Sequence, residues 1–284
     1  MPELPEVETV RRLLDPAIVG RTITGVTLHE FAGVLESTLP GVDPAATIPG
    51  RRVQDTARRG KYLFVLLDAS MALVIHLRMT GRLLLLPRPA PPVRFEHLAL
   101  HLDDGMDVRF ADQRKFGRVM LASITDIERL DRALGPEPDA ARLTPAALHI
   151  AMARRPGKIK NALLDQTLIA GLGNIYVDEA LYRARIHPER ASNTLTIEEL
   201  KRLLRAIRVV LNQALKHKGT TFSSFENPYG EAGGNSQFLR VYGRSGDLCT
   251  RCGTRFERIV VGGRGTTFCS HCQVNSAPEA SRQS

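Results

Sequence analysis

The sequence predicts an α+β protein with two domains: an N-terminal β-sandwich preceded by a short helix, and a C-terminal helical domain that ends in a four-cysteine finger. Three observations predict this class. Short apolar runs of strand character recur from residue 21 to about residue 122. Helical patterns replace them after residue 134, and all four cysteines lie between Cys249 and Cys272. With 284 residues, 43% of them hydrophobic, the chain can form two cores without disulfides.

The N-terminal β-sandwich domain is expected over residues 1–134. A helix over about residues 7–14 should end at Asp15-Pro16, because the residue before a proline avoids the helical conformation. Strands follow, and the turn signal Asp103-Asp104-Gly105 ends the last of them. Several short strands at this spacing favour a sandwich or a barrel. The predicted strands cover residues 21–26, 61–67, 71–77 and 97–102.

The chain changes character at a linker signal, residues 135–138. The clearest helix follows over about residues 197–217. Thr196 and Glu199 match a capping box, and Gly219 stands just past the end, where a left-handed cap is common. A loop rich in Gly, Ser and Asn covers residues 219–237. We expect a helical domain over residues 135–241 that includes this loop, a finger over residues 242–276, and a disordered tail over residues 277–284.

The chain is basic, with a formal net charge of +9 and a sequence pI of about 9.8. Such an excess favours a polyanionic partner, either nucleic acid or an acidic membrane surface. The sequence has no apolar run of the roughly 18 residues that a membrane helix needs. Its acidic, proline-rich first residues do not resemble a signal peptide. We therefore expect a soluble, cytoplasmic protein.

The four cysteines are spaced as two pairs, Cys249-x2-Cys252 and Cys269-x2-Cys272. This spacing is typical of one structural Zn²⁺ site in which a turn offers each pair. A catalytic zinc is not expected, because four thiolates leave no open coordination position. The alternative is four unliganded thiols in a reducing compartment. Three arginines between the pairs predict a basic β-finger: Arg255, Arg258 and Arg264.

The N-terminus offers a nucleophile if Met1 is removed, which is usual before a small residue such as Pro2. An α-amine has a pKa near 7.7–8.0, so about a tenth of it is neutral at pH 7, against roughly 0.04% of lysine side chains. A secondary amine that attacks a sugar aldehyde carbon forms a cationic iminium, which draws electrons during elimination. The alternative is that Pro2 merely starts the chain.

Several sequence blocks are distinctive: residues 2–8 with Arg11-Arg12, residues 59–63, 76–81, 112–117, 171–176 and 241–244, and the four cysteines. These blocks resemble the formamidopyrimidine-DNA glycosylase family, and they follow the family's order along nearly the whole chain. Leu4 and Pro5 are similar to the oxidised-purine branch, since a Gly usually stands at the position of Leu4 in the endonuclease VIII branch. The resemblance implies a helix–two-turn–helix element in the helical domain and a monomeric protein.

The resemblance implies a catalytic group at the start of the chain. Pro2 would be the nucleophile, and Glu3 the acid or base that assists opening of the sugar ring, which requires a carboxylate within reach of the same sugar. Lys61 would hold the lesion and its phosphate, and Glu6 would help to shape the lesion pocket. Without the resemblance, Lys61 would be a solvated lysine at a strand start and Glu6 a solvated acid at a helix start.

Met79, Arg114 and Phe116 match the family's void-filling residues. A base that is flipped out leaves a hole in the duplex, which an apolar wedge and a guanidinium can fill. Taken alone, Met79 and Phe116 would more often be core residues. The family block usually has Pro and Arg where this chain has Gln113 and Lys115, and these departures leave the geometry of the loop open.

Other residues resemble the family's DNA contacts. Asn174 lies in a glycine-rich turn that opens a helix, a natural phosphate site, and Lys160 and Arg264 resemble the other phosphate clamps. His76 is either a phosphate contact or a hydrogen-bonded histidine within a strand. Residues 220–237 align with the segment that covers the flipped base, but residues 225–231 depart from the family pattern, so no base-reading residue is assigned there.

The resemblance thus implies a bifunctional DNA glycosylase and abasic-site lyase. It would excise 8-oxoguanine and formamidopyrimidines from double-stranded DNA through a Schiff base with Pro2, then cut the strand by β,δ-elimination, also at abasic sites. Two alternatives are a non-catalytic zinc-finger protein that binds damaged DNA and an endonuclease VIII-like glycosylase for oxidised pyrimidines. Pro2, Glu3 and Lys61 are all present, which favours an enzyme, because a non-catalytic relative is expected to have lost at least one of them.

Overall fold

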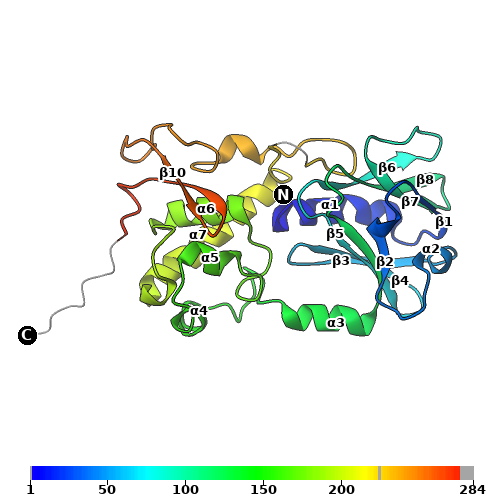
Figure 1. Ribbon diagram of the computed structural model, residues 1–284, viewed down its shortest axis with the longest axis horizontal. Coiled ribbons are helices and arrows are strands. Elements are labelled where there is room, and N and C mark those ends of the chain that lie inside the picture. Colours follow the sequence, from blue (N-terminus) through cyan, green and yellow to red (C-terminus); the bar gives the residue numbers. More distant parts are fainter. Residues whose placement is uncertain (1, 223–224, 276–284) are drawn as a thin grey trace, which may run out of the picture. The chain divides into compact units, whose positions relative to one another are not determined.

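The computed structural model describes residues 2–222 and 225–275, and the chain forms two compact units (Figure 1). Unit 1 comprises Met1–Ala133 and Ala214–Ser236, and unit 2 comprises Leu134–Gln213 and Gln237–Ser284. Unit 1 is therefore discontinuous in sequence. The tail predicted to be disordered, residues 277–284, lies outside the described residues.

Unit 1 begins with helix α1 (Leu4–Ile18), which is longer than the predicted helix over residues 7–14. The side chain of Glu6 accepts a hydrogen bond from the N–H of Glu3 (2.8 Å), as in a capping box, and so fixes an earlier start. The expected end at Asp15-Pro16 is wrong. Pro16 has no N–H to donate, but the loss of this one hydrogen bond in the last turn does not end the helix, which continues to Ile18, a buried core residue.

Two β-sheets form the body of unit 1, with strand orders β1-β7-β8-β6 and β2-β9-β5-β4-β3. The four predicted strands all fall within these sheets. The strands are β1 (Ile23–Leu28), β2 (Leu35–Ser37), β3 (Val53–Arg59), β4 (Tyr62–Leu67), β5 (Met71–His76), β6 (Gly81–Pro87), β7 (Glu96–Leu102), β8 (Met106–Asp112) and β9 (Arg118–Ser123). The helical segments of unit 1 other than α1 are η1 (Ala32–Val34), α2 (Pro44–Thr47) and α3 (Ile124–Ala133), and η3 (Asn235–Phe238) begins at its edge.

The inner faces of both sheets and one face of α1 share a single hydrophobic core. Leu63 of β4, Ile75 of β5 and Leu83 of β6 belong to it. Phe225, far along the chain, belongs to it as well, which explains why residues 214–236 group with unit 1. Unit 2 therefore differs from the predicted helical domain over residues 135–241, which included this segment.

Unit 2 contains the remaining helices, and its longest, α7 (Ile197–Lys216), nearly matches the prediction. The capping box forms, since the N–H of Glu199 donates to Thr196 Oγ1 (3.2 Å) and the N–H of Thr196 donates to Glu199 Oε2 (2.9 Å). The last residues of α7 belong to unit 1. No described helix is long and apolar enough to cross a membrane. The others are α4 (Pro145–Ala153), α5 (Ile159–Leu164), α6 (Asn174–Ala184) and η2 (Ser192–Thr194).

The predicted β-finger is a hairpin of β10 (Glu257–Val261) and β11 (Arg264–Phe268) in unit 2. Its turn is Gly262-Gly263, both with positive φ. Gly262 allows a close approach that a side chain would block, because an added Cβ would lie 2.2 Å from the Asn161 side-chain oxygen. The α+β fold class, with a β-sandwich and a helical domain bearing a cysteine finger, is confirmed.

Candidate functional site

The residues predicted to be catalytic lie at the start of α1 and at the turn between β3 and β4. Pro2 and Glu3 are buried just before α1, and Lys61 is buried at the turn. Arg58 of β3 forms an ion pair with Glu8 of α1 (Nε–Oε2 3.1 Å), which joins the hairpin to the helix close to both groups. A buried carboxylate and a buried ammonium are costly to desolvate, so their placement here indicates a functional site. The alternative of a solvated Lys61 is wrong.

Glu8 of α1 is a carboxylate that stays ionised near this site. Burial acts to raise its pKa, but hydrogen bonds from Arg11 and Arg12 and the positive charges of Arg11 and Arg58 lower the pKa to about 2. The carboxylate therefore stays ionised and forms ion pairs with all three arginines. Arg11 and Arg12 stand within a family motif in the sequence, but no sequence pattern predicts this role for Glu8.

Glu6 connects the N-terminus to the late segment of unit 1. Its Oε2 accepts the N–H of Glu3 (2.8 Å), and its Oε1 accepts the N–H of Thr220 (2.7 Å). Gly219 has φ +85°, and an added Cβ would lie 3.1 Å from Glu6 Cγ and Oε1. Glu6 is only 1% exposed, so the alternative of a solvated helix-start acid is wrong.

His76 ends β5 beside the turn that carries Lys61. Its ring packs edge-on against Tyr62 (centroids 4.7 Å apart), and its Nδ1 accepts the N–H of Arg78 (3.0 Å). Burial lowers the pKa of His76 to about 3, and the positive charges of Arg78 and Lys61 lower it further in the same direction. The imidazole is therefore neutral near pH 7 and can offer a hydrogen bond rather than a charge.

The three predicted void-filling residues come together. Arg114 Nη1 lies 3.0 Å from Met79 Sδ, and Arg114 Cζ lies 4.7 Å from the centroid of the Phe116 ring. Phe116 is 49% exposed, so it is a surface residue and not part of the core. An exposed aromatic ring held against a guanidinium has the chemistry that a wedge into a duplex requires.

Asp112 builds the loop that carries Arg114 and Phe116. Its Oδ1 accepts the N–H of Arg114 (3.1 Å) and the hydroxyl of Thr80, and its Oδ2 accepts the N–H groups of Phe116 (2.8 Å) and Gly117 (2.7 Å). The sequence analysis quoted Asp112 only as the first residue of a block. Its signal was its position between a strand and a turn, where aspartate often accepts backbone N–H groups.

The two departures from the usual block do not disturb this loop. The side chains of Gln113 and Lys115 are exposed, and Lys115 adopts the left-handed conformation (φ +59°). Gly117 is required by space, because an added Cβ would lie 2.5 Å from Phe110 Cζ. The backbone contacts of Asp112 therefore fix the loop whatever the side chains at these two positions.

In unit 2, Asn174 and Lys160 hold the strand that carries Arg264. Asn174 is the first residue of α6, and its Nδ2 donates to the carbonyl oxygen of Gly265 (3.0 Å). Lys160 Nζ donates to the same oxygen (3.2 Å) and to Thr266 Oγ1 (2.7 Å). Arg264 itself is exposed at the start of β11. Asn174, Lys160 and Arg264, the predicted DNA contacts of this unit, therefore lie together at the start of β11.

Lys160 is fully buried, however, and its Nζ forms an ion pair with Asp178 Oδ1 (2.6 Å). Burial raises the pKa of Asp178, and the Lys160 ammonium opposes that shift. In this structure the ammonium holds α6 to the finger and is out of reach of solvent. Lys160 therefore does not present an exposed cation, and a direct phosphate contact by it stays a prediction.

Glu179, next to Asp178 on α6, anchors the chain that leads into the finger. Its carboxylate accepts the N–H groups of Arg240, Val241 and Tyr242 at 2.8–3.0 Å. Neither Asp178 nor Glu179 was predicted from the sequence to have a role. Their signal was two adjacent carboxylates inside an otherwise apolar helical stretch, since buried acids must be paired.

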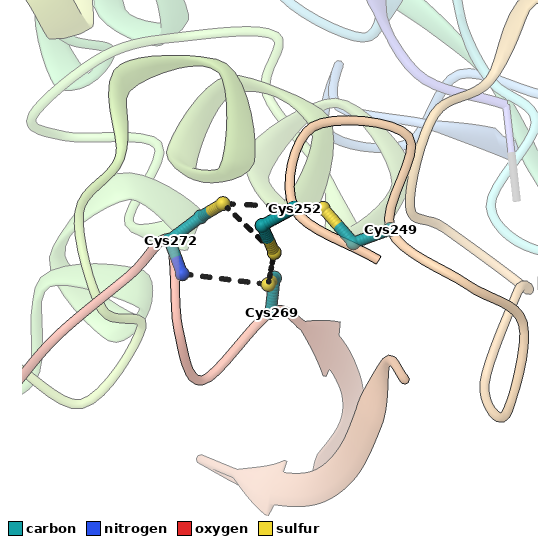
Figure 2. Close-up of side chains that lie close together, drawn as sticks. All are labelled: Cys249, Cys252, Cys269 and Cys272. Atoms are coloured by element: carbon teal, nitrogen blue, oxygen red, sulfur yellow. Dashed lines mark hydrogen bonds between the residues drawn. The ribbon is translucent and has the colours of Figure 1, made fainter. Parts of the chain in front are cut away.

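The four cysteines converge as predicted (Figure 2). Their Sγ atoms all lie within 4.8 Å of one another, and Cys252 Sγ is 3.5 Å from both Cys269 Sγ and Cys272 Sγ. A tetrahedral zinc with bonds of about 2.3 Å separates its sulfur ligands by about 3.8 Å. The cluster fits one structural zinc, which four thiolates would hold with no position left for catalysis.

Hydrogen bonds tie this cluster to the rest of unit 2. The hydroxyl of Tyr182 on α6 lies 3.3 Å from Cys249 Sγ, and the Tyr182 ring packs edge-on against Phe256. Gln273 accepts the N–H of Cys269 (2.9 Å) and donates to the carbonyl oxygen of Ile186 (2.9 Å). Groups that hydrogen-bond to the ligand residues orient them for the metal.

Comparison with known proteins agrees with this geometry. The formamidopyrimidine-DNA glycosylase N-terminal domain matches residues 1–119, the H2TH domain of the same enzymes residues 134–226, and a zinc finger found in FPG and IleRS residues 246–274. The formamidopyrimidine-DNA glycosylase of Herpetosiphon aurantiacus is 43% identical, over 96% of this chain and 100% of its own length. The chain belongs to the formamidopyrimidine-DNA glycosylase family. The relative from Chloroflexus aggregans is 46% identical, over 96% of this chain and 99% of its own.

Solved structures of formamidopyrimidine-DNA glycosylases share the fold. A Lactococcus lactis variant bound to DNA containing Fapy-dG is 37% identical, with a TM-score of 0.88 over 96% of this chain and 100% of its own. A complex of the wild-type Lactococcus lactis protein with DNA containing an oxidised pyrimidine, and one of MutM with DNA containing carbocyclic 8-oxo-G, have the same identity, TM-score and coverage. The fold, the finger and the family resemblance predicted from the sequence are therefore confirmed.

Proposed function

We propose that this chain excises oxidised purines, namely 8-oxoguanine and formamidopyrimidines, from duplex DNA and then cleaves the strand by β,δ-elimination. The observation that carries the proposal is the burial of Pro2 and Glu3 just before α1 and of Lys61 at the turn between β3 and β4, two strands that contact α1. Family relatives support the substrate class, since solved complexes contain Fapy-dG and carbocyclic 8-oxo-G. We place this activity in a monomer that acts on the DNA of the cytoplasm.

Pro2 supplies the nucleophile once Met1 has been removed. Its secondary amine forms a bond to C1′ of the damaged nucleotide as the bond from C1′ to the base breaks. The base leaves with the electrons of that bond and takes up a proton, and the proline nitrogen loses its N–H proton. Glu3 then donates a proton to the ring oxygen as the nitrogen lone pair opens the sugar, which leaves an iminium between the proline nitrogen and C1′. The positive charge of the iminium accepts the electrons of the C2′–H bond when that proton is removed, and the 3′ phosphate leaves. A second elimination releases the 5′ phosphate.

Lys61 and His76 would bind the damaged nucleotide during this reaction. The ammonium of Lys61 holds the phosphate and lesion, and the neutral imidazole of His76 offers a hydrogen bond without adding charge. Met79, Arg114 and Phe116 fill the space that the flipped base leaves. Each of these residues belongs to unit 1.

Unit 2 would supply sequence-independent affinity. Arg264 contacts a phosphate directly, and the N-terminus of α6 at Asn174 offers backbone N–H groups to another. Lys160 contributes through the strand it holds, because its ammonium is buried. Such contacts release counterions, so affinity should fall steeply with added salt.

Blocking the N-terminal amine tests the mechanism. A protein with an uncleaved N-terminal extension should fold, retain zinc and bind duplex DNA, yet form no adduct with 8-oxoguanine DNA under borohydride. An amide nitrogen cannot attack C1′, because its lone pair is delocalised. Mass spectrometry should map the adduct of the unblocked protein to Pro2. An adduct at Lys61, or full activity with Met1 retained, contradicts the proposal.

Two controls separate the remaining alternatives. Glu3→Gln keeps the amine and should impair base excision more than cleavage of a pre-formed abasic site. A second duplex should carry an oxidised pyrimidine, because the wild-type Lactococcus lactis relative has been solved with such DNA. Faster trapping on that duplex would favour an endonuclease VIII-like preference. Binding without any adduct would favour a non-catalytic damage-binding protein.

A further inference from the structure

The late segment of unit 1, residues 225–234, is attached to strand β6 by two contacts beyond the core. The N–H of Leu85 donates to the carbonyl oxygen of Pro228 (2.8 Å). Arg82 Nη1 forms an ion pair with Glu226 Oε2 (2.5 Å). Because β6 is the edge strand of its sheet, its outer backbone groups are available for this attachment.

Strand β6 is also close to the void-filling residues Met79, Arg114 and Phe116. Met79 lies two residues before the first residue of β6, and β8, which pairs with β6, leads into the loop of Arg114. Arg82 is opposite Ala111 in this pairing. A cavity of about 220 Å³ lies at the same place, and Thr80, Arg82, Asp112 and Glu226 are among its lining residues. The Arg82–Glu226 pair thus connects residues 225–234 to the strands that position Met79 and Arg114.

Thr220, a few residues before this segment, contacts the start of α1. Thr220 donates its N–H to Glu6, whose other oxygen accepts the N–H of Glu3. Within the segment, the buried Asn227 side chain accepts the N–H groups of Tyr229 (2.9 Å) and Glu231 (3.1 Å), which makes a rigid turn beside Glu226.

The pair itself adds little to the stability of the fold. The side chains of Arg82 and Glu226 are 22% and 36% exposed, and ion pairs exposed to this degree contribute weakly to folding. The core residue Phe225 and the Leu85–Pro228 hydrogen bond hold the segment to the unit without it. What the ion pair fixes is the position of the segment relative to β6.

We infer that Arg82 and Glu226 are positioning residues for base excision. The inference rests on the proposed function and adds to it. The pair sets the distance between residues 225–234 and the void-filling strands, so that the damaged base is held while the space it leaves is filled. Neither residue touches the reacting atoms. An abasic site has no base to hold, so its cleavage does not depend on the pair.

Single-turnover rates on two duplexes test this inference. One duplex carries 8-oxoguanine and the other a pre-formed abasic site. Arg82→Gln and Glu226→Gln should each lower the 8-oxoguanine rate about tenfold or more, since small misplacements near a reacting centre are costly in rate. Both should leave abasic cleavage at the wild-type rate. The exchanged variant, Arg82→Glu with Glu226→Arg, should recover most of the excision.

Lys218→Gln is the matched control. It removes a cation of the same unit from an exposed ion pair with Glu231 (3.7 Å) and should change neither rate. Equal rates for wild type and both single variants, or an exchanged variant that recovers nothing, overturn the inference and leave the proposed function intact. Parallel losses on both duplexes also overturn it, since they show a general defect. A wild-type protein that cleaves neither duplex overturns both.

Discussion

Three buried carboxylates fix the functional segments residue by residue. Glu6, Asp112 and Glu179 each accept backbone N–H groups, at the catalytic end, in the void-filling loop and before the finger. Charged acceptors make stronger hydrogen bonds than neutral ones, and two oxygens can hold several donors at once. A single side chain can therefore set the path of a whole loop.

Asp112→Asn tests this role. An amide keeps one acceptor oxygen and turns a donor toward N–H groups that the carboxylate accepted, which costs about 1–3 kcal/mol for each group left unpaired. We expect a lower melting temperature and slower excision of 8-oxoguanine, because Arg114 and Phe116 lose their fixed backbone. Gln113→Ala, at the exposed neighbouring position, should match the wild type in both measurements. A normal Asp112→Asn protein would contradict the assigned role.

His76 should make the fold sensitive to acid. Its pKa is about 3 in the folded protein, against an ordinary value of 6.5. Between these values the unfolded chain binds a proton that the folded protein does not, so stability is full above pH 6.5 and falls as the pH drops toward 3. His76→Gln should therefore lose less stability than the wild type between pH 7 and pH 4.5 in urea titrations. An unchanged pH dependence would mean that His76 is protonated normally in the folded state.

At the scale of elements, helix α6 organises the whole finger. Asn174, Asp178, Glu179 and Tyr182 all lie on it and reach the finger strand, the chain before the finger and a zinc ligand. A helix is rigid over this length, so the finger is attached to one body at several points. Arg264 takes its position from this attachment.

The buried Lys160–Asp178 pair should be a structural part of that attachment. Lys160→Met leaves a buried carboxylate unpaired, which costs about 3–5 kcal/mol, and DNA affinity should fall with it. Adding Asp178→Leu should restore stability and affinity together, as measured by urea unfolding and duplex binding. Arg264→Ala should instead leave stability unchanged and reduce the slope of log affinity against log salt concentration by about one unit. If the double variant is stable but still binds weakly, Lys160 contacts DNA directly.

Sequence patterns predicted elements better than the contacts between them. The strand β5, the helix α7 and the cysteine pairs follow from local periodicity and spacing, which is where sequence is informative. The end of α1 predicted at Asp15-Pro16 was wrong, because burial of Ile18 in the core outweighs the local effect of the proline. The role of Asp112 and the burial of Lys160 depend on partners that only folding brings together.

For the whole molecule, the finger should depend on its metal. Cys249→Ser removes one of four ligands, and we expect loss of zinc in metal analysis together with loss of affinity for lesion duplex, since structural zinc sites supply folding energy to small fingers. Ser270 lies between the ligands Cys269 and Cys272, and Ser270→Ala should keep both the zinc and the affinity for lesion duplex. Retained affinity in a zinc-free Cys249→Ser protein would show that the finger does not contribute to DNA binding.

The discontinuity of unit 1 has a consequence for how the protein is made. A ribosome releases the chain from its N-terminus, and domains commonly fold as they emerge. Residues 1–133 emerge first, but they lack Phe225 for the core and Thr220 for the carboxylate of Glu6. The helices of unit 2 must be synthesised before these partners appear. The catalytic end, although translated first, is completed only when the chain has passed residue 236, so a truncated product carries Pro2 and Glu3 without a finished site.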